Sequence, residues 1–146
     1  MRAGMATERI TEASRRILVA EDDAVTMRLI TAILEKEGYA VVPACDGKEA
    51  YRILHTDAGF MAAIFDINMP HLGGLEVVRY MGTERRLMRI PVMMMTAERD
   101  PTLGAESFAA GALFFLPKPF SAEQLVATLR MLIGKASAVM TIPAAN

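Results

Sequence analysis

Along this chain, short apolar runs alternate with longer stretches in which apolar residues recur every three or four positions. The runs have the length of buried strands, and the periodic stretches are typical of amphipathic helices. The apolar runs predict strands over residues 17–20, 39–44, 61–65, 91–95 and 112–116. The periodic stretches predict helices over residues 24–37, 47–54, 75–87, 102–111 and 122–133.

Five strands that alternate with five helices predict one α/β domain with a parallel sheet. The strands are continuously apolar, which indicates a doubly wound sheet with helices on both faces. If the strand order is that of the flavodoxin-like wind, 2-1-3-4-5, the first and third strands are expected to be neighbours. The domain is predicted over residues 16–134, with an N-terminal extension at 1–15 and a C-terminal tail at 135–146.

Composition and charge limit the classes of function. The chain has 146 residues, 53% of them hydrophobic and 23% charged, which is typical of a folded domain and not of a disordered segment. The net charge of -1 gives no global attraction to nucleic acid or to an anionic membrane, and neither is expected as a partner. No signal peptide or membrane span is evident in the sequence, so a cytoplasmic location is expected.

The chain has one cysteine, Cys45, which excludes an internal disulfide and a cysteine-rich zinc site. Cys45 follows the second predicted strand and is expected to be a small buried residue, in preference to a redox sensor. His55 and His71 have no partner at metal-ligand spacing, so neither is expected to bind a metal.

Polar residues stand where the predicted strands end. In open parallel sheets, ligands bind beyond the carboxyl ends of the strands, so these residues are expected to lie close together. The first strand is followed by Glu21, Asp22 and Asp23, the third by Asp66 and Asn68, the fourth by Thr96 and the fifth by Lys118.

This set of residues has the parts of a phosphoryl-transfer site with an aspartate nucleophile. Clustered carboxylates repel one another, and Mg²⁺ is the natural cation to occupy such a cluster. Lys118 suits a phosphoryl oxygen, and Thr96 offers a hydroxyl donor. Taken singly, each residue has a plainer role as a helix cap, a turn residue or a solvated lysine. Their occurrence at the ends of four different strands favours the functional interpretation.

Four segments carry a resemblance to a known family: "ILVAEDD", "AAIFDINMPHLGGLEV", "IPVMMMTAE" and "GALFFLPKPF". From Arg16 to Gly134 the chain resembles the receiver domain of two-component response regulators. The resemblance implies that Asp66 accepts a phosphoryl group from a histidine kinase or a histidine phosphotransfer protein. It further implies that Mg²⁺ is held by Glu21, Asp22, Asp66 and the backbone carbonyl of Asn68, and that Asp23 lies outside this shell.

The resemblance also implies how a signal would leave the site. Thr96 and Lys118 would contact the new phosphoryl group, and Lys118–Pro119 would be a cis peptide. Phe115, where the family often has tyrosine, would fill space that Thr96 vacates. The surface of the fourth helix, fifth strand and fifth helix would then change. Pro117 lacks a backbone donor and is expected to weaken pairing at the end of the fifth strand.

Several functions stay open at this point. The leading expectation is a stand-alone phosphoacceptor switch, because no further domain fits after Gly134 or before Arg16. Its output would be protein–protein contact or an intermediate place in a phosphorelay, and homodimerisation on phosphorylation stays open. A phosphatase is disfavoured because Asn68 stands where a second aspartate would act as general acid, so the chain is not expected to be an enzyme. A receiver-like interaction module that is never phosphorylated is the remaining alternative.

Overall fold

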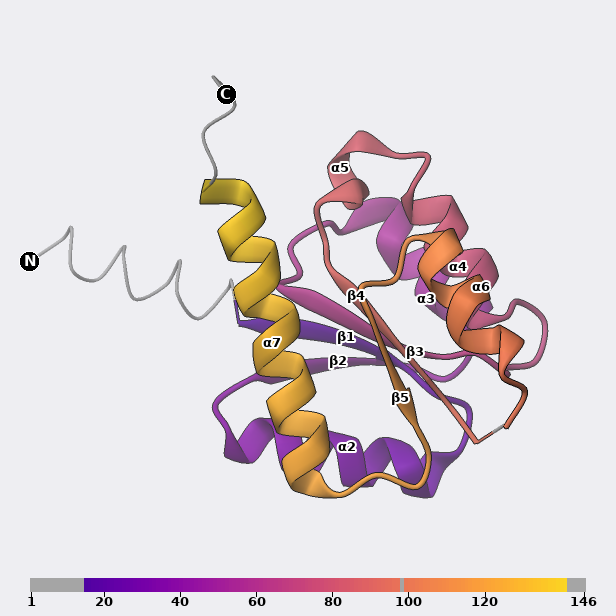
Figure 1. The fold of residues 1–146 in the computed structure, drawn as a ribbon, viewed down its shortest axis with the longest axis vertical. Coiled ribbons are helices and arrows are strands. Elements are labelled where there is room, and N and C mark those ends of the chain that lie inside the picture. The colour runs from indigo at the N-terminus through magenta and orange to yellow at the C-terminus, as the bar shows by residue number, and fades with distance from the viewer. Residues whose placement is uncertain (1–14, 98, 142–146) are drawn as a thin grey trace, which may run out of the picture.

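Five parallel strands form one sheet in the order β2-β1-β3-β4-β5, which confirms the predicted strand order (Figure 1). The computed structural model describes residues 15–97 and 99–141. Within these ranges β1 and β3 are neighbours near the centre of the sheet, and β2 and β5 are its edges. The strands are β1 (Arg16–Ala20), β2 (Ala40–Ala44), β3 (Ala62–Asp66), β4 (Val92–Thr96) and β5 (Phe114–Pro117).

Helices cover both faces of the sheet, as a doubly wound fold requires (Figure 1). Helices α2 and α7 pack on one face, and α3, α4, α5 and α6 pack on the other. The helices are α2 (Ala24–Lys36), α3 (Gly47–Thr56), α4 (Gly74–Met81), α5 (Arg85–Met88), α6 (Thr102–Ala110) and α7 (Ala122–Thr141).

The continuous apolar runs are explained by burial on both faces. In β3, Ala62 and Ile64 belong to the core beneath α2 and α7, whereas Ala63 and Phe65 belong to the core beneath α3 and α4. Successive side chains of a strand point to opposite faces, so both sets must be apolar when both faces are covered. The run can end in a carboxylate only at the rim of the sheet, where Asp66 lies.

The two strand prolines lie in the edge strands, Pro43 in β2 and Pro117 in β5, where a missing backbone donor is tolerated. The expected weakening beyond Pro117 is not observed. The Lys118 N–H donates to the Thr96 carbonyl at 2.8 Å, so the pairing of β5 with β4 continues past the proline.

The helix predicted over residues 75–87 is wrong as a single element, because the structure divides it into α4 and α5. Gly82 is the C-cap of α4, and the Thr83 hydroxyl donates to the Tyr80 carbonyl at 2.7 Å, a local bond that competes with helix continuation. Leu87 in α5 is still fully buried, which explains why the apolar period runs through the break.

Two further local expectations differ from the structure. Helix α7 continues past Gly134 to Thr141, although an interior glycine costs about 1 kcal/mol relative to alanine. The Lys135 and Ala136 that follow favour helix, which offsets this cost. The predicted burial of Cys45 is wrong, because its side chain is exposed in the turn before α3.

Residues 1–14 of the expected N-terminal extension and residues 142–146 of the expected tail lie outside the described residues. Arg15 is attached to the domain, because its guanidinium donates to the carbonyls of Glu37 and Gly38 at 3.1 and 2.9 Å. Among the described residues, no helix is both long and apolar enough to cross a membrane.

Candidate functional site

Three carboxylates meet at the carboxyl ends of the two central strands. Glu21 follows β1 and Asp66 ends β3, and the register pairs the preceding residues, Ala20 and Phe65, side by side. Oxygens of Glu21, Asp22 and Asp66 all lie within 4.8 Å of one another. Glu21 and Asp66 are buried, whereas Asp22 is exposed, so the cluster opens to solvent on the Asp22 side.

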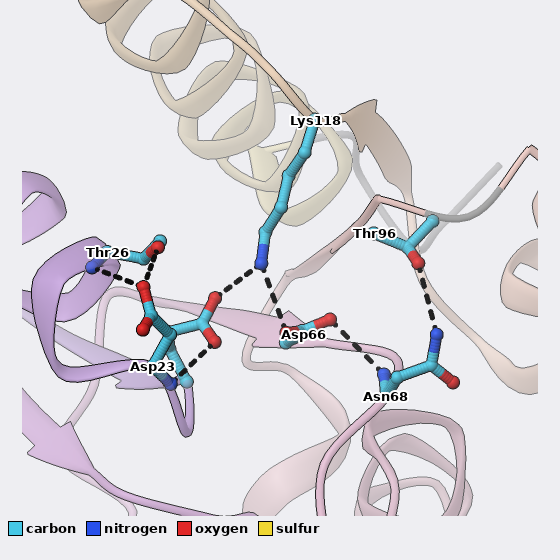
Figure 2. A network of polar contacts seen from close by, with 7 residues as sticks. Asp23, Thr26, Asp66, Asn68, Thr96 and Lys118 are labelled. Atoms are coloured by element: carbon cyan, nitrogen blue, oxygen red, sulfur yellow. Dashed lines mark hydrogen bonds and ion pairs between the residues drawn. The ribbon is translucent and has the colours of Figure 1, made fainter.

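Lys118 reaches this cluster from the end of β5. Its Nζ lies 3.1 Å from Asp66 Oδ2 (Figure 2). The same Nζ lies 2.6 Å from Glu21 Oε1. The Lys118–Pro119 peptide is cis. Burial lowers the pKa of Lys118, but the hydrogen bond to Glu21 and the charge of Asp66 outweigh it and hold that pKa above its usual value. Lys118 is therefore a positive charge inside the acidic cluster at neutral pH.

The pKa of Asp22 is raised from its usual value. Although the residue is exposed, partial desolvation of its carboxyl is the main cause, and the hydrogen bond with Glu21 and the negative charge of Glu21 add to it. The backbone and Lys118 act in the opposite direction. The negative charge of Asp22 is thus disfavoured beside Glu21, and a bound cation would relieve this repulsion.

Asp66 is held on both of its oxygens. While Oδ2 faces Lys118, Oδ1 accepts a hydrogen bond from the Asn68 N–H at 3.2 Å (Figure 2). The Asn68 side-chain amide in turn donates to Thr96 Oγ1 at 3.4 Å. Thr96 is fully buried at the end of β4. Asn68 therefore links the Asp66 carboxylate to the Thr96 hydroxyl, through its backbone N–H on one side and its side-chain amide on the other.

Asp23 has a different task from its neighbours. Its carboxylate accepts from the Thr26 N–H at 2.9 Å and so caps the N-terminus of α2 (Figure 2). Its own N–H donates to Glu21 Oε2 at 3.0 Å. The plainer role of a helix cap applies to Asp23, whose carboxylate is not among those of the cluster.

Phe115 lies on the same face of the sheet as Thr96. Met94 belongs to the core beneath α3 and α4, and strand alternation puts Thr96, two residues later, on that side. Phe115 is half-buried and packs against the same core, whereas its neighbour Phe114 packs on the other face. An aromatic ring and the site hydroxyl therefore share one side of the β4–β5 pair.

The start of α4 packs closely against the backbone of Asp66, a feature that the sequence did not reveal. A Cβ added at Gly74 would lie 2.3 Å from the Asp66 carbonyl oxygen and 2.8 Å from Met94 Cε. The Gly74 N–H donates to the Ile67 carbonyl at 3.1 Å. His71, in the loop that leads to α4, has a φ of 71°, a left-handed conformation that is uncommon outside glycine.

The donor set fits Mg²⁺. Carboxylate oxygens of Glu21, Asp22 and Asp66 are hard ligands, and they are close enough for one ion to contact all three. Among the described residues, Lys118 alone forms ion pairs with this cluster, so three carboxylates are offset by one positive charge and a divalent cation would complete the charge balance. The ligand role expected of the Asn68 carbonyl stays a prediction.

Comparison with known proteins agrees with the geometry. Residues 17–130 match the family model of the response regulator receiver domain. The transcriptional regulatory protein TctD of Salmonella typhimurium is 35% identical over 122 residues, which are 84% of this chain and 53% of TctD. The response regulator MprA of Mycobacterium tuberculosis is 38% identical over 121 residues, 82% of this chain and 51% of MprA. The chain thus spans about half the length of these relatives.

Solved structures show the same fold. The chemotaxis protein CheY4 of Vibrio cholerae has a TM-score of 0.76 at 31% identity, over 82% of this chain and 98% of CheY4. The receiver domain of the sensor histidine kinase PA1611 of Pseudomonas aeruginosa, solved with a magnesium ion coordinated in its active-site cleft, also has a TM-score of 0.76. It is 29% identical and covers 83% of this chain and 98% of that domain. By sequence and by fold, the chain belongs to the response regulator receiver domain family.

Proposed function

We propose that this chain is a phosphoacceptor switch of two-component signalling and that Asp66 is the residue phosphorylated. The observation that carries the proposal is the setting of the Asp66 carboxylate. This carboxylate is buried at the end of a central strand and lies beside Glu21 and Asp22. It forms an ion pair with Lys118 and accepts a hydrogen bond from the Asn68 N–H.

The donor would be the phosphohistidine of a histidine kinase or a histidine phosphotransfer protein. An oxygen of Asp66 attacks phosphorus, the P–N bond to the imidazole breaks, and its electron pair returns to the imidazole nitrogen. Lys118 offsets the charge on the phosphoryl oxygens, and the Thr96 hydroxyl offers them a hydrogen bond. These are the only steps that this chain's residues need to perform, so we infer an acceptor and not an enzyme that turns over a substrate.

Magnesium belongs to the same proposal. Glu21, Asp22 and Asp66 would hold the ion, with the Asn68 carbonyl as a further ligand. When bound, Mg²⁺ would neutralise charge on the phosphoryl oxygens. A protein donor must approach on the Asp22 side, where the cluster is exposed. There the first turns of α2 present Val25 and Leu29, which are 64% and 54% exposed and offer an apolar contact surface.

The output would be a change of surface. A phosphoryl group adds about two negative charges beside Thr96. Movement of the Thr96 hydroxyl toward these charges would free space on the face that it shares with Phe115, and Phe115 would fill that space. The altered surface would be formed by α6, β5 and α7. A cytoplasmic location accords with such partners, and homodimerisation on phosphorylation stays a prediction.

The test is covalent labelling. The chain is incubated with Mg²⁺ and acetyl phosphate, and its intact mass is measured. Wild type should gain one phosphoryl group, Asp66→Asn none, and Asp57→Asn, a surface aspartate paired with Arg16, as much as wild type. Labelling of Asp66→Asn equal to wild type would refute the assignment, and no labelling of wild type would favour an interaction module that is never phosphorylated. A phosphorelay intermediate would in addition pass its phosphoryl group to a histidine phosphotransfer protein.

A further inference from the structure

A mostly exposed cluster of arginines and apolar side chains lies where α3, α4 and α5 meet. We call it the arginine patch, and it is formed by Tyr51, Arg52, Arg85, Arg86, Met88 and Arg89. Helix α5 leads directly into β4 and so lies at the amino ends of the strands, whereas the acidic cluster lies at their carboxyl ends (Figure 1). The arginine patch is therefore separate from the phosphoryl site, from the α2 surface beside that site and from the surface of α6, β5 and α7.

The patch is held in place by contacts among the three helices that carry it. The rings of Tyr51 in α3 and Tyr80 in α4 pack with their centroids 4.5 Å apart, and the Tyr80 hydroxyl lies 3.4 Å from His55 Nδ1. The Arg86 guanidinium of α5 donates to the His55 carbonyl at 3.1 Å and to the Tyr80 hydroxyl at 3.4 Å. A partner would thus meet a surface that is already ordered, which lowers the entropic cost of binding.

The patch carries an excess of positive charge. Arg52, Arg85 and Arg89 are exposed, and none of them forms an ion pair within residues 15–97 and 99–141. Arg86 faces the Glu84 carboxylate, but at 4.0 Å. These guanidinium groups repel one another weakly across solvent, and a negatively charged partner would replace that repulsion with attraction.

The patch also has apolar surface among its charges. Met88 stands between Arg85 and Arg89 in the sequence and is 61% exposed, and Tyr51 is 38% exposed. Arginine, methionine and aromatic residues are the types enriched in protein–protein interfaces, and tyrosine and arginine often contribute most of the binding energy. This composition indicates a protein partner that supplies an apolar side chain as well as negative charge.

We propose that the arginine patch binds an acidic segment of a partner protein. Carboxylates of this segment pair with Arg52, Arg85 and Arg89, since a guanidinium can donate two parallel hydrogen bonds to one carboxylate, and an apolar side chain of the segment covers Met88.

Two other anionic partners fit the patch less well. A single-stranded nucleic acid stacks its bases on free aromatic faces, whereas the Tyr51 ring already packs against Tyr80. An anionic membrane binds a helix with a continuous apolar face, whereas α5 has four residues and presents one exposed apolar side chain, Met88.

The inference is independent of the proposed phosphorylation, because no residue of the patch belongs to the acidic cluster. Wild type, phosphorylated wild type and Asp66→Asn should all bind the acidic segment equally. The patch would keep a partner attached whether or not a signal has arrived. Failure of this proposal would leave the labelling of Asp66 unaffected, so the two proposals can fail separately.

Charge reversal tests the proposal. The probe is a fluorescein-labelled peptide of glutamates around a central leucine, and binding is followed by fluorescence anisotropy at physiological ionic strength. Wild type should bind this peptide and should not bind its counterpart in which glutamine replaces every glutamate. Arg85→Glu/Arg89→Glu should weaken binding by about tenfold or more. Arg28→Glu/Lys36→Glu, which reverses two exposed charges of α2 on the other face of the sheet, makes the same change in net charge and should leave binding unchanged.

Further probes separate the apolar contact and the competing partners. Met88→Ala should weaken binding of the leucine-containing peptide and leave binding of an all-glutamate peptide unchanged. The proposal is overturned if wild type does not bind the acidic peptide, if the α5 reversal binds it like wild type, if the α2 reversal weakens binding equally, or if Met88→Ala has no effect. Tighter binding of a single-stranded oligonucleotide, or of vesicles of phosphatidylserine and phosphatidylcholine, than of the peptide would also overturn it.

Discussion

Lys118 Nζ and Glu21 Oε1 lie 2.6 Å apart, although 97 residues separate the two in the sequence and their strands are not neighbours in the sheet. The lysine side chain extends from the end of β5 past β4 and β3 to the end of β1. On its way it also contacts Asp66 at 3.1 Å. One positive charge thus holds together two carboxylates of the cluster, and the site is part of what stabilises the fold.

Removing that charge should destabilise the protein. Glu21 is almost fully buried, with only 1% of its side chain exposed, so Lys118→Met would leave a buried carboxylate without the opposite charge that it faces in the wild type. We expect a loss of about 3 kcal/mol or more in the free energy of unfolding, measured by urea denaturation at neutral pH. The double variant Lys118→Met/Glu21→Gln should lose less than Lys118→Met alone. An equal or greater loss would show that packing of the lysine stem, and not the charge, is responsible.

Magnesium binding should depend on Asp22 and not on its neighbour Asp23. Asp22→Asn removes one carboxylate of the cluster and is expected to weaken Mg²⁺ binding by at least about tenfold in a calorimetric titration. Asp23→Asn has the same change in charge, but the Asp23 carboxylate is bonded to Thr26, and asparagine caps helices well. If both variants lost affinity equally, general negative charge and not coordination would hold the ion.

Gly74 should not tolerate a side chain. A Cβ there would lie 2.3 Å from the Asp66 carbonyl oxygen, so Gly74→Ala must displace the backbone that carries Asp66. We expect a loss of about 2 kcal/mol in stability and slower labelling by acetyl phosphate. Gly104→Ala is the matched control in α6, because no atom lies within 4 Å of its added Cβ, and it should stabilise the protein by about 0.5–1 kcal/mol. Unchanged stability of Gly74→Ala would show that this loop shifts at little cost.

The parallel sheet and the meeting of the strand ends could be predicted from the sequence, whereas the strand order was expected only on the assumption of a flavodoxin-like wind. Continuous apolar runs indicate strands that are buried on both faces, and parallel strands bring their carboxyl ends to one edge. These two rules place Glu21, Asp22 and Asp66 at one edge of the sheet, and the order that makes β1 and β3 neighbours brings them together. The resemblance of segments such as "AAIFDINMPHLGGLEV" then indicated a role for each residue.

Three features could not be predicted from the sequence, because each depends on the path of the chain in three dimensions. The partner of Lys118 could not be read from spacing, because a long side chain can end beside any of several carboxylates. The close approach of Gly74 to Asp66 depends on the path of the loop, which no periodicity encodes. The break between α4 and α5 was hidden because Leu87 keeps the apolar period while Thr83 turns the backbone.

At the N-terminal end of β1, the ion pair of Arg16 with Asp57 allows a prediction of how stability depends on pH. Arg16 donates to both carboxylate oxygens of Asp57, at 2.7 and 3.2 Å, and this hydrogen bonding holds the pKa of Asp57 below its usual value of 3.8 despite partial burial. The unfolded chain therefore binds a proton at a higher pH than the folded chain does. The stabilisation by the Arg16–Asp57 pair is complete above the pKa that Asp57 has in the unfolded chain. It is lost as the pH falls through the lower pKa that Asp57 has in the folded chain.

Asp57→Asn should accordingly reduce stability at neutral pH and have no effect in strong acid. Both side chains are about one third exposed, so solvent screening limits the expected loss to about 0.5–1 kcal/mol near pH 7. In urea denaturation the difference between wild type and variant should persist down to about pH 4 and shrink below it. Asparagine is the better choice than a change at Arg16, because the Arg16 guanidinium also stacks on the Phe60 ring at 4.6 Å. A difference that stayed constant from neutral pH into strong acid would mean that the Asp57 charge contributes nothing and that the variant acts through the Gly59 turn, whose N–H donates to Asp57 at 2.9 Å.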